Sequence, residues 1–287
     1  MRLIRAELLK IRRRQATWVM LILSVVLMAL LHLLGSLAFV FGGIIEFPAA
    51  YGGISQFAFG LGGLLAVVYT AMYVGSDWNW GVIRNVVARG ESRTNYLLAK
   101  AAALAIVLAI FVLVIYAVGI AMAYVSGLVL NLPVASPLRG RGLMDLVDNI
   151  VIGYPVLLER AAIGFAVAVA LRSQLAGAVV GIVLFLGESV VKFTMLGVSL
   201  SQRAGSFLGE DGGSVDLIGP EWYQFLPVSV GDYAIGATPG GSAGIAFVIE
   251  QFLIRPVPLA QALAAVLVYL VVAIGISIVS FRRQEIT

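Results

Sequence analysis

The sequence predicts an all-α integral membrane protein with six transmembrane helices, and three observations lead to this prediction. Of the 287 residues, 61% are hydrophobic and only 12% are charged. The mean hydropathy is +1.03. A soluble domain of this size carries about twice that share of charged residues to cover its surface. Finally, the apolar residues fall into six long runs, and about 20 such residues suffice for a helix to cross a bilayer.

The first 15 residues predict a basic amphipathic helix lying in the headgroup plane. Apolar residues recur at helical spacing, and six cations occupy the other positions. The apolar residues are Leu3, Ile4, Leu8 and Ile11, and the cations are Arg2, Arg5, Lys10, Arg12, Arg13 and Arg14. A plain anchor for the first span remains an equal alternative. A cleaved signal peptide is not expected, because the apolar run that follows is too long.

The six spans are expected within a single transmembrane domain, 1–287. Their predicted ranges are 18–41, 57–74, 97–126, 149–171, 175–196 and 257–281. The turn Arg172-Ser173-Gln174 is so short that the fourth and fifth spans must be antiparallel neighbours. The long segment 197–256 is expected to form an outer helical cap, with aromatic residues between Pro220 and Pro227 and an amphipathic surface helix at Gly244–Arg255.

The distribution of charge predicts the orientation. One side of the six-span arrangement, comprising the N-terminus, the loop near 75–100, the turn 172–174 and the C-terminus, holds thirteen of the 19 basic residues. It holds only four of the 15 acidic ones. The positive-inside rule therefore places both termini in the cytoplasm. Arg139 and Arg141 are exceptions, because they fall on the outer side.

The polar loop 77–93 separates the second and third spans and predicts a short amphipathic helix. Gly81 precedes it and Gly90 ends it. Its apolar residues are Val82, Ile83, Val86 and Val87, and its cations are Arg84, Arg89 and, beyond Gly90, Arg93. From composition alone, two interpretations stay open: a docking helix for a soluble partner, or an ordinary basic loop obeying the positive-inside bias.

Four charged residues lie inside the apolar spans: Glu159, Arg160, Glu188 and Lys192. An ionised side chain facing lipid at this depth costs on the order of 3 kcal/mol. We therefore expect Arg160 to pair with Glu188, and Glu188 to reach Lys192 one helical turn away. Such a polar network either joins spans four and five structurally or forms the wall of a transport pathway that changes partners.

Gly177 and Gly181 form a Gly-x-x-x-Gly pattern on the fifth span, which lets another helix approach closely. The sequence leaves two partners open: a second copy of the chain, or another span of the same chain.

Several kinds of chemistry are not expected. The chain has no cysteine and one histidine, His32, so neither a disulfide nor a metal site is expected. It also lacks the Gly-x-x-x-x-Gly-Lys-Ser/Thr pattern that holds nucleotide phosphates. We therefore expect no catalytic residues, no cofactor in this chain and no nucleic-acid partner; membrane lipid is the expected surrounding.

Taken together, the segments resemble the ABC type-2 (type V exporter) permease family. The resemblance is sharpest in the polar loop, where the family pattern is matched by Asp77, Gly81-Val82-Ile83-Arg84, Gly90, Arg93 and Lys100. Val82 stands where the family usually has threonine, and the pair Trp78 and Trp80 is unusual. The resemblance favours the docking interpretation, with a coupling site formed by Asp77, Gly81, Val82, Ile83, Arg84, Val86, Val87, Arg89 and Arg93.

The resemblance implies a permease subunit in a bacterial or archaeal cytoplasmic membrane, paired with a second copy or homologue through spans one and five. A separate ATP-binding cassette ATPase would bind ATP and Mg²⁺ and drive export of an amphipathic substrate. Two alternatives remain: a membrane mechanotransmitter that moves no cargo, and a secondary transporter independent of ATP. The second would show inverted repeats or broken helices, and the sequence has no convincing sign of either.

Overall fold

The computed structural model describes residues 2–37, 47, 49–88, 90, 92–130, 136, 140–207, 221–240 and 257–283. Within these ranges the regular structure is helical throughout, and six helices are long and apolar enough to cross a membrane. The prediction of an all-α membrane protein is therefore confirmed. The expected surface helix Gly244–Arg255 lies outside the described residues, as does Arg139.

The helices follow the chain in this order: α1 (Arg2–Arg13), α2 (Gln15–Leu37), α3 (Ala49–Ser55), the π-helix η2 (Gln56–Leu61), α4 (Gly62–Asn79), α5 (Val82–Ala88), α6 (Arg93–Leu130), α7 (Gly142–Leu171), α8 (Gln174–Phe207), the 3₁₀ turn η3 (Trp222–Phe225), α9 (Pro227–Gly236) and α11 (Leu259–Arg283). The second span is the continuous run of α3, η2 and α4. It begins at Ala49 rather than near Phe57, because the residues of α3, which include Gly52 and Gly53, are already helical.

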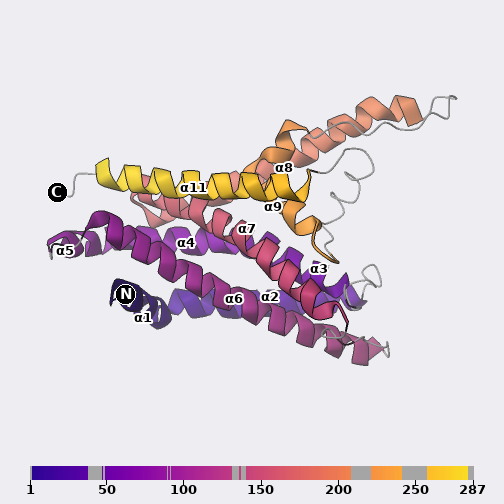
Figure 1. Ribbon diagram of the computed structural model, residues 1–287, viewed down its shortest axis with the longest axis horizontal. Helices are drawn as coiled ribbons and strands as arrows, with labels where there is room; N and C mark the ends of the chain where they lie inside the picture. The colour runs from indigo at the N-terminus through magenta and orange to yellow at the C-terminus, as the bar shows by residue number, and fades with distance from the viewer. Residues whose placement is uncertain are drawn as a thin grey trace.

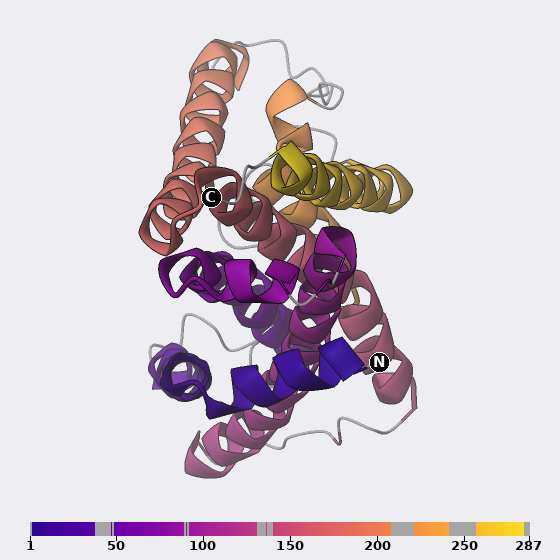
Figure 2. The same cartoon turned by 90° about the vertical axis from the view of Figure 1, so that its left-hand side faces the viewer.

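The two short helices α1 and α5 lie at the same end of the bundle as the last turn of α11 (Figure 1). The turn between α7 and α8 is there too, because a Cβ built on Gly75 near the end of α4 would lie 2.4 Å from Gln174. We call this the basic end. Viewed from it, α1 and α5 run across the long helices rather than along them (Figure 2). The segments that the charge count assigned to one side therefore do gather in space.

The centre of the bundle is α4, which packs against α7 and α8. Most of its side chains are buried, whereas α2 and α8 expose many large apolar side chains. This pattern is expected when lipid or another subunit, rather than water, covers the outer helices.

One helix of the outer segment, α9, is inserted into the bundle. Val230, Ala234 and Ile235 of α9 are buried, and α9 packs against α7, α8 and α11. Pro227 opens α9, a position where the missing N–H of proline costs nothing. The sequence predicted a cap over the bundle and did not foresee that one of its helices would enter the interior.

Candidate functional site

Asp77, the first residue of the polar loop, lies in the last turn of α4, and its carboxylate is buried. Lys10 Nζ donates to Oδ1 at 2.7 Å, and Tyr96 and Lys100 both donate to Oδ2. Arg14 Nη2 lies 3.8 Å from Oδ1. The Asp77 carboxylate therefore accepts hydrogen bonds from α1 and from α6, with Arg14 also near it, and it is turned toward the interior of this chain.

A second carboxylate, that of Glu7, lies beside Asp77. Glu7 accepts a hydrogen bond from the Tyr73 hydroxyl. Its carboxylate oxygens lie 3.6 Å from Lys10 Nζ and 3.5 Å from Lys100 Nζ. Two carboxylates thus face three cations. Buried charges persist only when they are paired in this way.

We name this group the Asp77 cluster: Glu7, Lys10, Arg14, Tyr73, Asp77, Tyr96 and Lys100. Its members come from α1, from the residue between α1 and α2, from α4 and from the beginning of α6. The cluster fixes α1 to the ends of α4 and α6 that lie at the basic end. Because removing one partner would leave the others buried without compensation, the joint resists small displacements.

The helix α5 begins three residues after the end of α4, as the loop pattern predicted. Gly81 and Gly90 have left-handed φ angles of 62° and 79°, so each supplies a turn that other residues adopt only with strain. Ile83 is buried in the core of this chain, and Val86 packs against that core. Ile83, a member of the expected coupling site, therefore attaches α5 to its own bundle, whereas Val86 stays partly exposed.

Other members of the predicted coupling site are less completely placed. Val82 is partly exposed on α5, and Arg93 is the first residue of α6. Arg84 and Val87 belong to α5, but their side chains lie outside the described part, as does all of Arg89.

Aromatic and polar contacts surround the base of α5. Trp78 packs edge-on against Phe281 of α11, with ring centroids 5.9 Å apart. Arg282 donates to Thr94 Oγ1 at 3.2 Å, which joins α11 to α6. Trp80 is exposed, and the guanidinium of Arg14 lies 5.0 Å from the centre of its ring. These contacts join the end of α4 and the start of α6, on either side of α5, to the last turn of α11.

Arg160 is fully buried in α7 and bridges several elements. It donates to the carbonyl oxygens of Phe59 and of Val228, the latter at 3.0 Å. Its Nη2 also lies 2.8 Å from Asp232 Oδ1. The expected pair with Glu188 is therefore wrong: Asp232 takes that place, because the insertion of α9 brings its carboxylate to the guanidinium.

The remaining intramembrane charges also lie near α9. Glu188 accepts the backbone N–H of Ser229 at 2.6 Å, in the first turn of α9, where the helix dipole favours a carboxylate. Lys192 Nζ lies 3.9 Å from Asp232 Oδ2. Glu159 is completely buried, and among the described residues its carboxylate has no hydrogen-bond partner. We refer to Arg160, Glu188, Lys192 and Asp232 as the Arg160 cluster.

Gly177 and Gly181 serve packing within the chain. A Cβ on Gly181 would lie 2.3 Å from Val67 Cγ1, and one on Gly177 would lie 2.9 Å from Ala168. These glycines let α8 approach α4 and α7 closely. Of the two partners that the sequence left open, the structure selects the same chain.

Sequence reasoning missed four members of these clusters, Glu7, Tyr73, Tyr96 and Asp232. It also did not foresee that Lys10 and Arg14 pair with Asp77. One signal was present, because Glu7, Lys10 and Arg14 recur at intervals of three and four and so share one side of α1. Tyr73 is buried, whereas a tyrosine near the end of an apolar span is more typical of a membrane–water interface. No sequence signal distinguishes Asp232 within the long outer segment.

Six apolar spans, a crosswise basic helix and a buried ion cluster that holds this helix to two of the spans define a multi-pass membrane protein. The family of ABC-2 family transporter proteins matches residues 3–188, and the chain belongs to this family. Comparison with curated proteins returned no match. The matched region contains the whole Asp77 cluster and ends at Glu188, before α9 and α11.

Proposed function

We propose that this chain is the permease subunit of an ATP-binding cassette exporter, and that a separate ATPase binds it at α5 and drives it. ABC-2 membership makes it a membrane component of a transporter. The single observation that carries the finer proposal is the Asp77 cluster, which joins α1, α4 and α6 directly beside α5. A force applied at α5 reaches all three helices through contacts that are too costly to break.

In this proposal the basic end faces the cytoplasm of a bacterium or archaeon, where the ATPase and its ATP and Mg²⁺ are found. The cations of α1, Arg93, Arg172 and the end of α11 gather at that end, as the positive-inside rule requires. The exposed residues available to the ATPase include Ala88 and Trp80, with Arg84 and Arg89 as the expected polar contacts.

The cargo path is proposed along the Arg160 cluster. A cavity of about 540 Å³ lies between α7, α8, α9 and α11, and Arg160 and Glu188 are part of its otherwise mainly apolar wall. A wall with a few charges among apolar side chains suits an amphipathic substrate. Closing or opening of α8 against α9 would change the access of such a molecule to the cavity.

A second copy or homologue completes the path. We place its interface on the outer faces of α2 and α8, the first and fifth spans that the family resemblance implicates. Val19, Ile22 and Val26 of α2 and Val183 and Val190 of α8 are exposed. Figure 2 shows α2 and α8 bordering the same side of the bundle, with α4 between them.

Co-purification tests the proposal. The tagged full chain, extracted from its own membrane, should retain an ATPase subunit, and Arg84→Glu should remove it. Arg141→Glu is the matched control, since Arg141 is exposed at the start of α7, away from α5. Reconstituted complex should export an amphipathic dye only with ATP. Transport without any ATPase would refute the proposal, and ATPase binding without transport of any cargo would favour a mechanotransmitter.

A further inference from the structure

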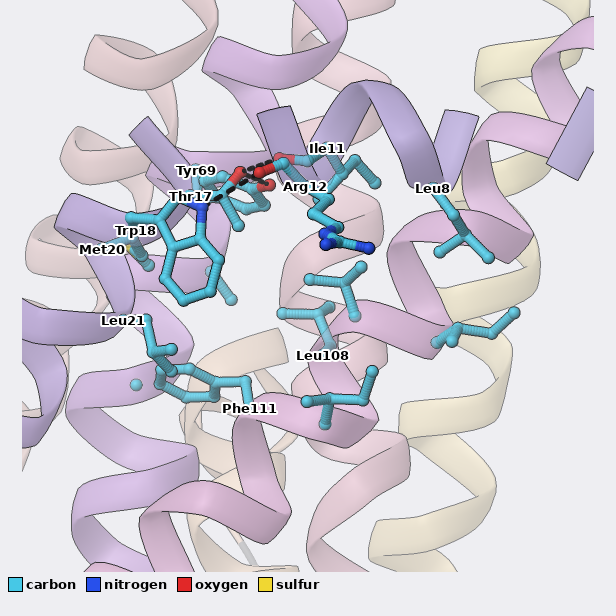
Figure 3. A pocket seen from close by; sticks show the side chains of 15 residues that line it. Leu8, Ile11, Arg12, Thr17, Trp18, Met20, Leu21, Tyr69, Leu108 and Phe111 are labelled. Atoms are coloured by element: carbon cyan, nitrogen blue, oxygen red, sulfur yellow. Dashed lines mark hydrogen bonds between the residues drawn. The ribbon is translucent and has the colours of Figure 1, made fainter. Parts of the chain in front are cut away.

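An apolar pocket of about 380 Å³ lies beneath α1 and is separate from the Arg160 cavity (Figure 3). Its walls come from α1, α2, α4 and α6. Leu8 and Ile11 form part of the roof, and Phe111 and Leu21 lie at the deep end (Figure 3). Nothing in the coupling or transport proposal uses this pocket.

One cation enters it. The guanidinium of Arg12 extends from α1 into the space between Leu8, Trp18 and Leu108 (Figure 3). The neighbouring cations Lys10 and Arg14 turn to Asp77 instead. Among the described residues, Arg12 has no carboxylate partner and its side chain donates no hydrogen bond. A guanidinium offers five donors, so Arg12 is available to an anion.

The other polar groups of the pocket are already engaged. Thr17 Oγ1 donates to the Ile11 carbonyl at 2.8 Å and shares a hydrogen bond with the Tyr69 hydroxyl. Trp18 Nε1 donates to the Arg12 carbonyl at 3.0 Å. A ligand of this pocket therefore needs one anionic group for Arg12 and an apolar body for the rest.

The position of the pocket favours a molecule of the bilayer. Trp18 lies at its rim and is half exposed, as is typical of tryptophan at a membrane boundary. Ile106 and Ile110 line the pocket and are exposed, so the pocket opens at a surface of the span α6, which we expect lipid to cover. Arg5 and Arg13 add exposed positive charge to the same helix.

We propose that this pocket binds an anionic phospholipid, with its phosphate on Arg12 and an acyl chain along Ile106, Ile110 and Phe111. The lipid occupies one side of α1, while Glu7 and Lys10 on another side hold the Asp77 cluster. Lipid bound here therefore supports the helix that anchors the end of α4. The proposal stands without the ATPase, because it concerns the chain and the bilayer alone.

Quenching of Trp18 fluorescence by brominated lipid tests the site. In the full chain, Trp78, Trp80 and Trp222 are replaced by Phe, which leaves Trp18 as the reporter, and the protein is placed in nanodiscs. Brominated phosphatidylglycerol should quench Trp18 more strongly than brominated phosphatidylcholine at equal mole fraction. Arg12→Gln should weaken this preference about fivefold to tenfold. Arg13→Gln removes the same charge from the next residue and should leave most of the preference for phosphatidylglycerol.

A second variant and a second measurement guard against a misleading result. Ile106→Phe fills the pocket from its exposed side and should also reduce the preference. Native mass spectrometry of the chain with all four tryptophans should show retained phosphatidylglycerol, which Arg12→Gln loses. Equal quenching by the two lipids, or an equal loss in Arg12→Gln and Arg13→Gln, would overturn the proposal. So would an undiminished preference in Ile106→Phe.

Discussion

Lys100 and Asp77 form a buried ion pair that joins the start of α6 to the end of α4. Each side chain is at most 2% exposed. The pair encloses the short α5 region between two fixed points, because α5 begins just after Asp77 and ends shortly before α6. A loop carrying three arginines is thereby presented on a rigid base.

Asp77→Asn should strongly destabilise the chain. The substitution leaves Lys10 and Lys100 with Glu7 as their one remaining carboxylate in the cluster, at 3.6 Å and 3.5 Å. Breaking a buried pair from one side typically costs about 3–5 kcal/mol. We expect a large fall in melting temperature, measured by thermal unfolding in detergent. Asp148→Asn, at an exposed position of α7, should change it little. Equal melting temperatures for the two variants would contradict the burial argument.

Tyr73→Phe should destabilise the chain more mildly. It removes the hydroxyl that donates to Glu7 while keeping the ring. A lost hydrogen bond to a charged group costs about 1.5–3 kcal/mol. Thermal unfolding measures the loss of stability. Glu7→Gln should reduce the stability of the Tyr73→Phe variant by less than it reduces that of the unchanged chain, because the two residues share one contact. Additive effects would show that they act separately.

Asp232→Ala should impair assembly more than Glu188→Ala does. Asp232 contacts Arg160 at 2.8 Å, whereas Glu188 contacts a backbone N–H. Yield of monodisperse protein on size-exclusion chromatography measures assembly. Exchanging the charges in Arg160→Asp with Asp232→Arg should recover part of the yield lost by either single change. Recovery by exchange with Glu188 instead would restore the pairing that the sequence suggested.

Gly181→Leu should destabilise the subunit itself. A Cβ at Gly181 would already meet Val67 at 2.3 Å, so a leucine forces α8 away from α4. Gly187→Leu is the control on the same helix, because a Cβ there meets nothing within 4 Å. The melting temperature of the isolated subunit should fall only in the first variant. A defect confined to association of two copies would return Gly181 to a dimer interface.

The sequence predicted the short α5 correctly because local rules govern it. Two glycines with left-handed φ bound a stretch whose apolar residues recur at helical spacing. It could not indicate that Ile83 turns inward, since an apolar side chain suits equally the core of its own bundle and a partner's groove.

For the intramembrane charges, the sequence predicted which residues matter but not how they pair. Glu159, Arg160, Glu188 and Lys192 were identified from sequence because a charge inside an apolar run stands out. Their pairing was not predicted, because Asp232 lies in a polar segment, where an acidic residue is common and gives no sequence signal. Only the insertion of α9 makes it the partner of Arg160.

The sequence by itself determined that this chain is a helical membrane protein with six spans, and which segments carry most of the cations. The thickness of the bilayer fixes how long an apolar run must be to cross it, so the order of apolar and charged residues along the chain is sufficient to predict the spans. The tertiary structure alone decided which charges meet. The Asp77 cluster joins Lys10 to a residue 67 positions away, and Arg160 reaches one 72 positions away. Such pairs depend on how helices pack, and burial then makes those contacts hard to break.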